Sequence, residues 1–209
     1  MPNIPQLLIL APILLMSLTI HELSHGIAAY WLGDDTAKRA GRLTLNPLKH
    51  LDFLGLIAFV IFKFGWAKPV PINPYNFQNF KRDTAITAAA GPISNFLLAT
   101  LTALVGRLFG VSLVSLMYSA NLFSVIIYLT VFYNLALGIF NLIPIPPLDG
   151  SKILGGFLPD QEYFRFMSWQ RYGMFILLGL LLLGEIMGVN VIGAIIMPPL
   201  QMLFRLLLG

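Results

Sequence analysis

The sequence predicts a mainly α-helical integral membrane protein with about five to six transmembrane segments and a small β-containing insert after the first helix. Of its 209 residues, 57% are hydrophobic and only 11% are charged, whereas soluble domains carry about 25% charged residues. Several apolar runs reach the length of about 20 residues that a bilayer-spanning helix needs. Too little polar surface remains to cover a soluble globule, so we expect one multi-pass membrane domain over residues 1–209.

The composition also limits the chemistry of any site. The chain contains no Cys, which excludes disulfides and thiolate ligands and leaves His, Asp and Glu to hold a metal ion. The net charge is +4, but the basic residues fall in loops between apolar runs, where membrane topology explains them. We therefore expect the lipid bilayer, and no nucleic acid, as the partner of the basic residues.

The first apolar run, residues 4–31, predicts the first membrane span. It ends at Gly33, Asp34 and Asp35, where a glycine and two acids stop both the helix and the apolar run. Its start lacks Lys and Arg, so it does not resemble a cleavable signal peptide. Four further full-length spans are predicted, at residues 84–109, 116–142, 172–189 and 191–208. Pro198 and Pro199 are expected to break or kink the last of them.

Residues 34–82 predict a β-containing or re-entrant insert at a membrane surface. Residues 53–64 are apolar but only about a dozen long, too short for a regular span. Residues 42–46 alternate polar and apolar side chains, the period of a strand, and the prolines within residues 68–74 favour an extended edge. An irregular loop with one short extra span is the alternative.

The basic residues predict the orientation of this insert. Because Lys and Arg collect on the cytoplasmic side, we expect a cytoplasmic insert in a protein of the inner (plasma) membrane, with the site on that side. Eight of the thirteen basic residues lie in it: Lys38, Arg39, Arg42, Lys49, Lys63, Lys68, Lys81 and Arg82.

Residues 21–25 read His-Glu-Leu-Ser-His, within the first predicted span. Spacing of i and i+4 on a helix places His21 and His25 on one face, where both can bind a single zinc ion. Glu22 beside them is suited to take a proton from an attacking water as a general base. Since ionisable groups oppose insertion into lipid, three of them on one apolar helix indicate a functional site.

A catalytic zinc site takes a third protein ligand, and position separates the candidates. Acids of the insert and near the segment ends read as surface charges. Asp149 differs, because it follows a proline-rich stretch that prevents a regular helix just after a predicted span. The candidates are His50, Asp34, Asp35, Asp52, Asp83, Asp149, Asp160, Glu162 and Glu185.

Taken together, these motifs resemble the site-2 protease family of intramembrane zinc metalloproteases. The resemblance rests on the residue 21–25 motif, on Asn141 followed by Pro-Pro-Leu-Asp-Gly at residues 146–150, and on residues 65–74 and 91–95. It implies that Asp149 is the third ligand, with one Zn²⁺ per chain, and a β-rich segment after the first motif. The chain has no room for the PDZ or CBS modules of many relatives, so a minimal form is expected.

We therefore expect a zinc metalloendopeptidase that cuts transmembrane substrates, single-span proteins above all, in regulated intramembrane proteolysis. A strand edge at Arg42, Thr44 and Asn46 would catch the unwound substrate by β-addition. Asn95 and Asn141 would hold substrate backbone or the oxyanion, with interhelical hydrogen bonds as an equal alternative. The rival function is a zinc transporter or a non-proteolytic metal-dependent membrane protein, which has no need of Glu22 as a base.

Overall fold

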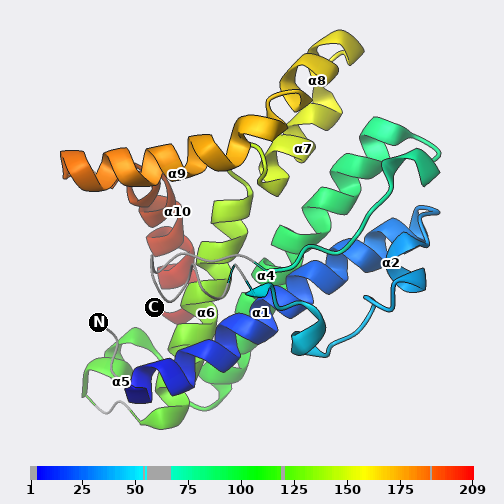
Figure 1. Ribbon diagram of the computed structural model, residues 1–209. Helices are drawn as coiled ribbons and strands as arrows, with labels where there is room; N and C mark the ends of the chain where they lie inside the picture. The colour runs from blue at the N-terminus through cyan, green and yellow to red at the C-terminus, as the bar shows by residue number, and fades with distance from the viewer. Residues whose placement is uncertain (1–3, 54, 56–66, 119–120, 189) are drawn as a thin grey trace.

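The computed structural model describes residues 4–209 apart from 54, 56–66, 119–120 and 189 (Figure 1). The regular structure of the described part is helical, in agreement with the mainly α-helical part of the predicted fold class. In chain order the helices are α1 (Ile4–Trp31), α2 (Thr36–Arg39), η1 (Pro47–Lys49), η2 (Pro74–Asn76), α4 (Phe80–Leu108), α5 (Leu113–Tyr118), α6 (Leu122–Asn141), α7 (Asp149–Phe157), α8 (Asp160–Met167), α9 (Gln170–Met187) and α10 (Val191–Leu208).

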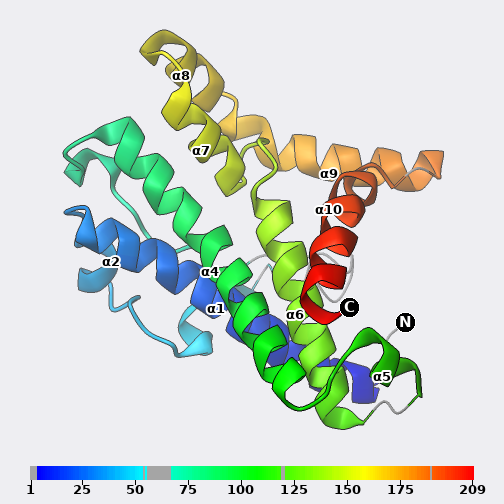
Figure 2. The same cartoon turned by 180° about the vertical axis from the view of Figure 1, so that it is seen from behind.

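Within the described residues, four helices are long and apolar enough to cross a membrane. They are Leu8–Trp31 within α1, and all of α4, α6 and α10. The fourth predicted span, residues 172–189, coincides with α9, which is not among these four helices and lies across the ends of α6 and α10 (Figures 1 and 2). The protein is therefore an integral membrane protein by its helices, while the count of five to six spans stays a prediction.

Side-chain caps correct the predicted starts of two helices. Asn79 accepts a hydrogen bond from the Arg82 amide and starts α4 at Phe80, four residues before the predicted start. Asn121 accepts from the Ser124 amide in the same way and starts α6, which begins six residues after the predicted start. Each cap satisfies an amide that the first helical turn leaves without an intrahelical partner.

Of the two predicted outcomes at Pro198 and Pro199, the break is wrong, because α10 continues through both prolines; the kink stays a prediction. Leu200 and Phe204, just beyond them, are buried against α6 in the main hydrophobic cluster. This packing helps to offset the loss of the hydrogen bonds that proline cannot donate.

The predicted strand at residues 42–46 is also wrong: the described part of the insert holds an isolated bridge between Leu51 and Ala67 and no named strand. Its backbone groups are bonded locally instead. The Thr44 carbonyl accepts from His50 Nε2 at 3.0 Å, and the Arg42 guanidinium donates to the Lys68 carbonyl at 2.7 Å. The predicted short segment at residues 53–64 lies almost wholly outside the described residues.

Residues 67–73, which we call the strap, follow an irregular extended path, as their prolines predict. Two carboxylates of the first helix region fasten the strap to α1. The Val70 amide donates to Glu22 Oε2 at 2.8 Å, and the Asn73 amide donates to Asp34 Oδ2 at 2.7 Å. The strap therefore runs beside the half of α1 that carries the His-Glu-Leu-Ser-His motif.

Asp34 is fully buried just after α1, where it joins three segments. Its carboxylate also accepts hydrogen bonds from Thr36 and from Asn76. Burial alone would raise the pKa of Asp34, but the hydrogen bonds from Thr36, Asn73 and Asn76 outweigh it and lower the pKa below its usual value of 3.8. Asp34 is thus a buried structural anchor and not the surface charge that the sequence predicted.

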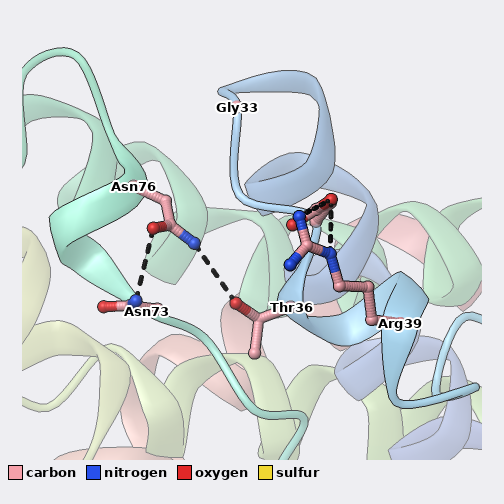
Figure 3. Close-up of a pocket in the computed structure, with 6 residues that line it drawn as sticks. Gly33, Thr36, Arg39, Asn73 and Asn76 are labelled. Atoms are coloured by element: carbon pink, nitrogen blue, oxygen red, sulfur yellow. Dashed lines mark hydrogen bonds and ion pairs between the residues drawn. The ribbon is translucent and has the colours of Figure 1, made fainter.

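An open polar pocket of about 450 Å³ lies beside this anchor (Figure 3). In this pocket, Asn73 Nδ2 donates a hydrogen bond to Asn76 Oδ1, and Asn76 Nδ2 donates to Thr36 Oγ1. Arg39 forms an ion pair with Asp35 at 2.7 Å. Its polar lining consists of Gly33, Asp35, Thr36, Arg39, Asn73 and Asn76.

Helix α4 is the centre of the fold and packs against α1, α6 and α7 (Figures 1 and 2). Its buried face is made of small residues, which let the neighbouring backbones approach closely inside a membrane. Part of this face, at Ala99 and Ala103, packs against apolar side chains of α6 and α10 to form the main core. The small buried residues of α4 include Ala88, Gly91, Asn95, Ala99, Ala103 and Gly106, and the core includes Val131, Leu135, Leu200 and Phe204.

Candidate metal centre

The structure brings His21, His25 and Asp149 together, although 128 residues separate the first and the last. The Nε2 atoms of the two histidines lie 3.0 Å apart. Asp149 Oδ2 lies 3.1 Å from His21 Nε2 and 3.2 Å from His25 Nε2. All three side chains are buried, and they are the residues that the sequence and the family resemblance pointed to.

Helix α4 fixes the orientation of both imidazole rings. His21 Nδ1 lies 2.6 Å from Asn95 Oδ1, and His25 Nδ1 lies 2.7 Å from the backbone carbonyl oxygen of Thr87. Because a carbonyl oxygen can only accept, His25 Nδ1 carries the proton and its Nε2 presents a lone pair. Both rings therefore turn Nε2 toward Asp149.

Gly91 lies between Thr87 and Asn95 on the same face of α4, one helical turn from each. A Cβ atom at this position would lie 2.5 Å from His25 Cε1 and 2.6 Å from His21 Cε1. Real Cβ atoms do not come this close to other heavy atoms, so a larger residue would displace the rings. Glycine is thus required for the imidazoles to rest directly on the α4 backbone.

Asp149 reaches the histidines because the chain turns sharply after α6. Helix α6 ends at Asn141, and the proline-rich residues 142–148 form a non-helical turn, as predicted, before α7 starts at Asp149. A Cβ at Gly150 would lie 2.6 Å from the carbonyl oxygen of Ile143. This close approach holds the start of α7 against the end of α6 and directs Asp149 toward α1.

The donor set fits a zinc ion. Two imidazole nitrogens and a carboxylate oxygen are the ligand types that zinc takes in catalytic sites, with a further position for water. Ligands at 2.0–2.1 Å around a tetrahedral ion lie about 3.3 Å from one another, close to the 3.0–3.2 Å separations found here. Lone pairs that converge at such distances repel one another unless a cation or a proton lies between them.

Glu22 is half-buried next to His21 and does not belong to this ligand group. One oxygen of its carboxylate, Oε2, accepts the hydrogen bond from the Val70 amide of the strap. A carboxylate held in this way beside the ligands is suited to proton transfer. The strap thus positions the residue that the sequence identifies as the base.

The predicted substrate residues occupy different surroundings. Asn95 is fully buried behind His21, and the Asn141 amide donates to the Leu137 carbonyl of its own helix at 3.0 Å. Arg42 is buried, Thr44 is half-buried, and Asn46 is exposed, where it caps η1 by accepting from the Leu48 amide. None of these contacts tests the proposed roles in substrate binding, which stay predictions.

Several parts of the site carry no sequence signal. The Thr87 carbonyl could be supplied by any residue, and the Val70 amide by any residue except proline, because both are backbone groups. The role of Gly91 depends on the ring positions of another helix. The Asn95 bond to His21 could have been anticipated only as one of the two alternatives for a buried asparagine, an interhelical hydrogen bond.

Comparisons with known proteins assign the chain to a peptidase family. A sequence model of peptidase family M50 matches residues 110–183, which include Asp149. "Putative zinc metalloprotease YwhC" of Bacillus subtilis is 39% identical over 171 residues, which cover 79% of this chain and 76% of that protein. No solved structure matches the chain significantly.

Two mycobacterial proteins are more distant relatives. "Putative zinc metalloprotease Rip2" of Mycolicibacterium smegmatis is 30% identical over 172 residues, which cover 80% of this chain and 64% of that protein. The protein of the same name from Mycobacterium tuberculosis is 27% identical over 180 residues, covering 83% and 66%. The chain thus spans a little under two thirds of the length of these two relatives.

Proposed function

This chain belongs to peptidase family M50, and we propose that it is an intramembrane zinc endopeptidase that cleaves transmembrane protein substrates. The observation that carries the proposal is the convergence of His21 Nε2, His25 Nε2 and Asp149 Oδ2 within 3.0–3.2 Å. These atoms would hold one Zn²⁺ per chain. The zinc-metalloprotease names of its relatives support the same reading.

Glu22 would act as the general base. When bound, zinc would polarise the scissile carbonyl and acidify water. Glu22 would take the proton from the attacking water and return it to the nitrogen of the leaving amine. The hydrogen bond from the Val70 amide to Glu22 Oε2 supports this role, because it holds the carboxylate in one orientation.

The helices and charges support a site inside the bilayer on its cytoplasmic side. His25 and His21 precede Gly33 by 8 and 12 residues on α1, and at about 1.5 Å per residue they lie about 12 and 18 Å from that end. The basic insert follows at the same end of α1. Because Lys and Arg collect on the cytoplasmic side, this end would face the cytoplasm, with the protein in the inner membrane.

Substrate capture is proposed at residues 42–46 and at Asn141. A transmembrane helix hides its carbonyls in internal hydrogen bonds, so the substrate must unwind before cleavage. Leu45 and Asn46 are exposed in this segment, where they would contact an unwound substrate without the strand edge that the sequence predicted. Asn95, buried against His21, would serve the site through that histidine.

Cleavage of a co-expressed single-span substrate by the Glu22→Gln and Asp149→Asn variants tests the proposal. We expect both variants to lose cleavage, and Asp149→Asn to lose zinc as well. Asp34→Asn is the matched acid control and should retain zinc. Cleavage by Glu22→Gln would refute the mechanism and favour the rival reading, a zinc transporter or static zinc protein, since such a site has no need of the Glu22 base.

A further inference from the structure

Behind the metal centre, a chain of hydrogen bonds connects His21 to α6. Asn95 Oδ1 lies 2.6 Å from His21 Nδ1, and Asn95 Nδ2 donates to Asn134 Oδ1 at 2.9 Å. Asn134 Nδ2 in turn donates to Ser17 Oγ at 2.8 Å and to the Thr130 carbonyl oxygen at 2.8 Å. Asn95, Asn134 and Ser17 are all fully buried, so water cannot replace these bonds.

The far end of this chain determines the direction of every hydrogen bond in it. The Thr130 carbonyl can only accept, so the Asn134 amide group must turn its NH₂ toward that carbonyl. Ser17 uses its hydroxyl hydrogen on the Ile13 carbonyl at 2.7 Å, so toward Asn134 it also acts as an acceptor. Asn134 therefore presents its oxygen to Asn95.

The same reasoning continues to the metal centre. Because Asn134 offers an acceptor, Asn95 must donate its NH₂ to it, which leaves Asn95 Oδ1 facing His21. An oxygen at 2.6 Å from Nδ1 requires a proton on that nitrogen. His21 is then held in the tautomer whose Nε2 carries a lone pair, the form that can bind a metal ion through Nε2.

We propose that Asn134 is a positioning residue for the metal centre: through Asn95 it fixes the tautomer and the ring orientation of His21 before any ion binds. The inference rests on the proposed function, because it assigns His21 Nε2 as a ligand. It adds a role for α6, a helix that supplies no ligand. Partners that orient a ligating histidine generally contribute 10-fold to 100-fold to metal affinity.

The test replaces Asn134 with Leu, which is apolar and similar in size, in the full chain in detergent. The zinc dissociation constant is measured by competition with a chromophoric chelator, and the His21 tautomer by ¹⁵N NMR of histidine-labelled protein. We expect Asn134→Leu to weaken zinc binding about tenfold or more and to give a mixture of His21 tautomers. Asn134→Asp, whose protonated carboxyl keeps one donor and one acceptor, should restore both.

Thr100→Val is the control. The Thr100 hydroxyl on α4 donates to the Phe96 carbonyl of its own helix and takes no part in the hydrogen bonds between Asn134 and His21. This variant should leave the zinc affinity and the His21 tautomer unchanged. If Asn134→Leu does not fold, the smaller Asn134→Ala decides by the same two measurements. Unchanged zinc affinity together with an unchanged His21 tautomer would overturn the proposal. If the wild type binds no zinc, the proposed function fails, while the tautomer comparison still decides the role of Asn134.

Discussion

The backbone amide of Val70 donates a 2.8 Å hydrogen bond to the Glu22 carboxylate. This contact joins the strap to the motif on α1 across 48 residues of sequence. It gives the proposed base a fixed partner that is independent of the Val70 side chain. Two substitutions of Val70 can therefore be compared, one that removes the amide hydrogen and one that keeps it.

Val70→Pro removes the amide hydrogen, whereas Val70→Ala keeps it. The extended, proline-flanked strap accommodates another proline, so the main change is the loss of the bond to Glu22. Hydrogen bonds to charged groups contribute about 1.5–3 kcal/mol, and we expect Val70→Pro to cleave a fluorescent single-span substrate at least about tenfold more slowly than Val70→Ala. Equal initial rates for the two variants would show that the bond does not position Glu22.

Removal of zinc should destabilise the fold, because three lone pairs then face one another in a buried site. A ligand present at a thousandfold excess over its Kd stabilises the folded state by about 4 kcal/mol. We expect a chelator to lower the Tm in detergent and added zinc to restore it. In His21→Ala and Asp149→Asn the zinc-dependent part of the Tm should disappear, and a persistent shift in both would contradict the assigned ligands.

Gly91→Ala should displace the imidazoles, because the new Cβ overlaps both rings. Overpacking of this kind costs about 1–3 kcal/mol, and we expect a lower Tm and less than one bound zinc per chain. Gly179→Ala on α9 is the matched control, since its Cβ meets no atom within 4 Å. There Ala should be neutral or slightly stabilising, as Ala is the better helix former. Similar losses in both variants would refute the close contact.

The lowered pKa of Asp34 predicts how the stability of the protein responds to acid. This pKa is lowered in the folded protein, so the contribution of Asp34 to stability is fully present above the unfolded value of 3.8 and is lost as the pH falls through the folded pKa. Asp34→Asn should lower the Tm at pH 7 and should flatten the decline of the Tm below about pH 4. If the Tm of Asp34→Asn fell below pH 4 as steeply as that of the wild type, the acid response would belong to other groups.

The candidate metal ligands on α1 could be predicted from the sequence because their geometry is local. The i, i+4 spacing of His21 and His25 places them on one face of any helix. Asp149 lies far along the chain, and its assignment depended on the resemblance to a family and on the prolines before it. Its approach to α1 depends on the packing of α6 and α7, which no local pattern encodes.

The strand predicted at residues 42–46 failed for a related reason. Alternation of polar and apolar residues describes one strand, but a strand also needs a partner that presents matching backbone groups. Here the Thr44 carbonyl is bonded by the side chain of His50, and the Arg42 side chain bonds the Lys68 carbonyl, so neither contact belongs to a backbone ladder. Likewise, the partners of Glu22 and His25 are backbone atoms, whose positions follow only from the folded chain.

Two hydrogen bonds from α4 hold the imidazoles of α1, and under the proposed function they would limit where a substrate helix could enter. Asn95 holds His21, and the Thr87 carbonyl holds His25. If α1 and α4 parted to admit a substrate helix, both histidines would lose their partners at the moment of entry. Under the proposed function, an entry route that keeps both of these hydrogen bonds would therefore have to lie elsewhere than between α1 and α4.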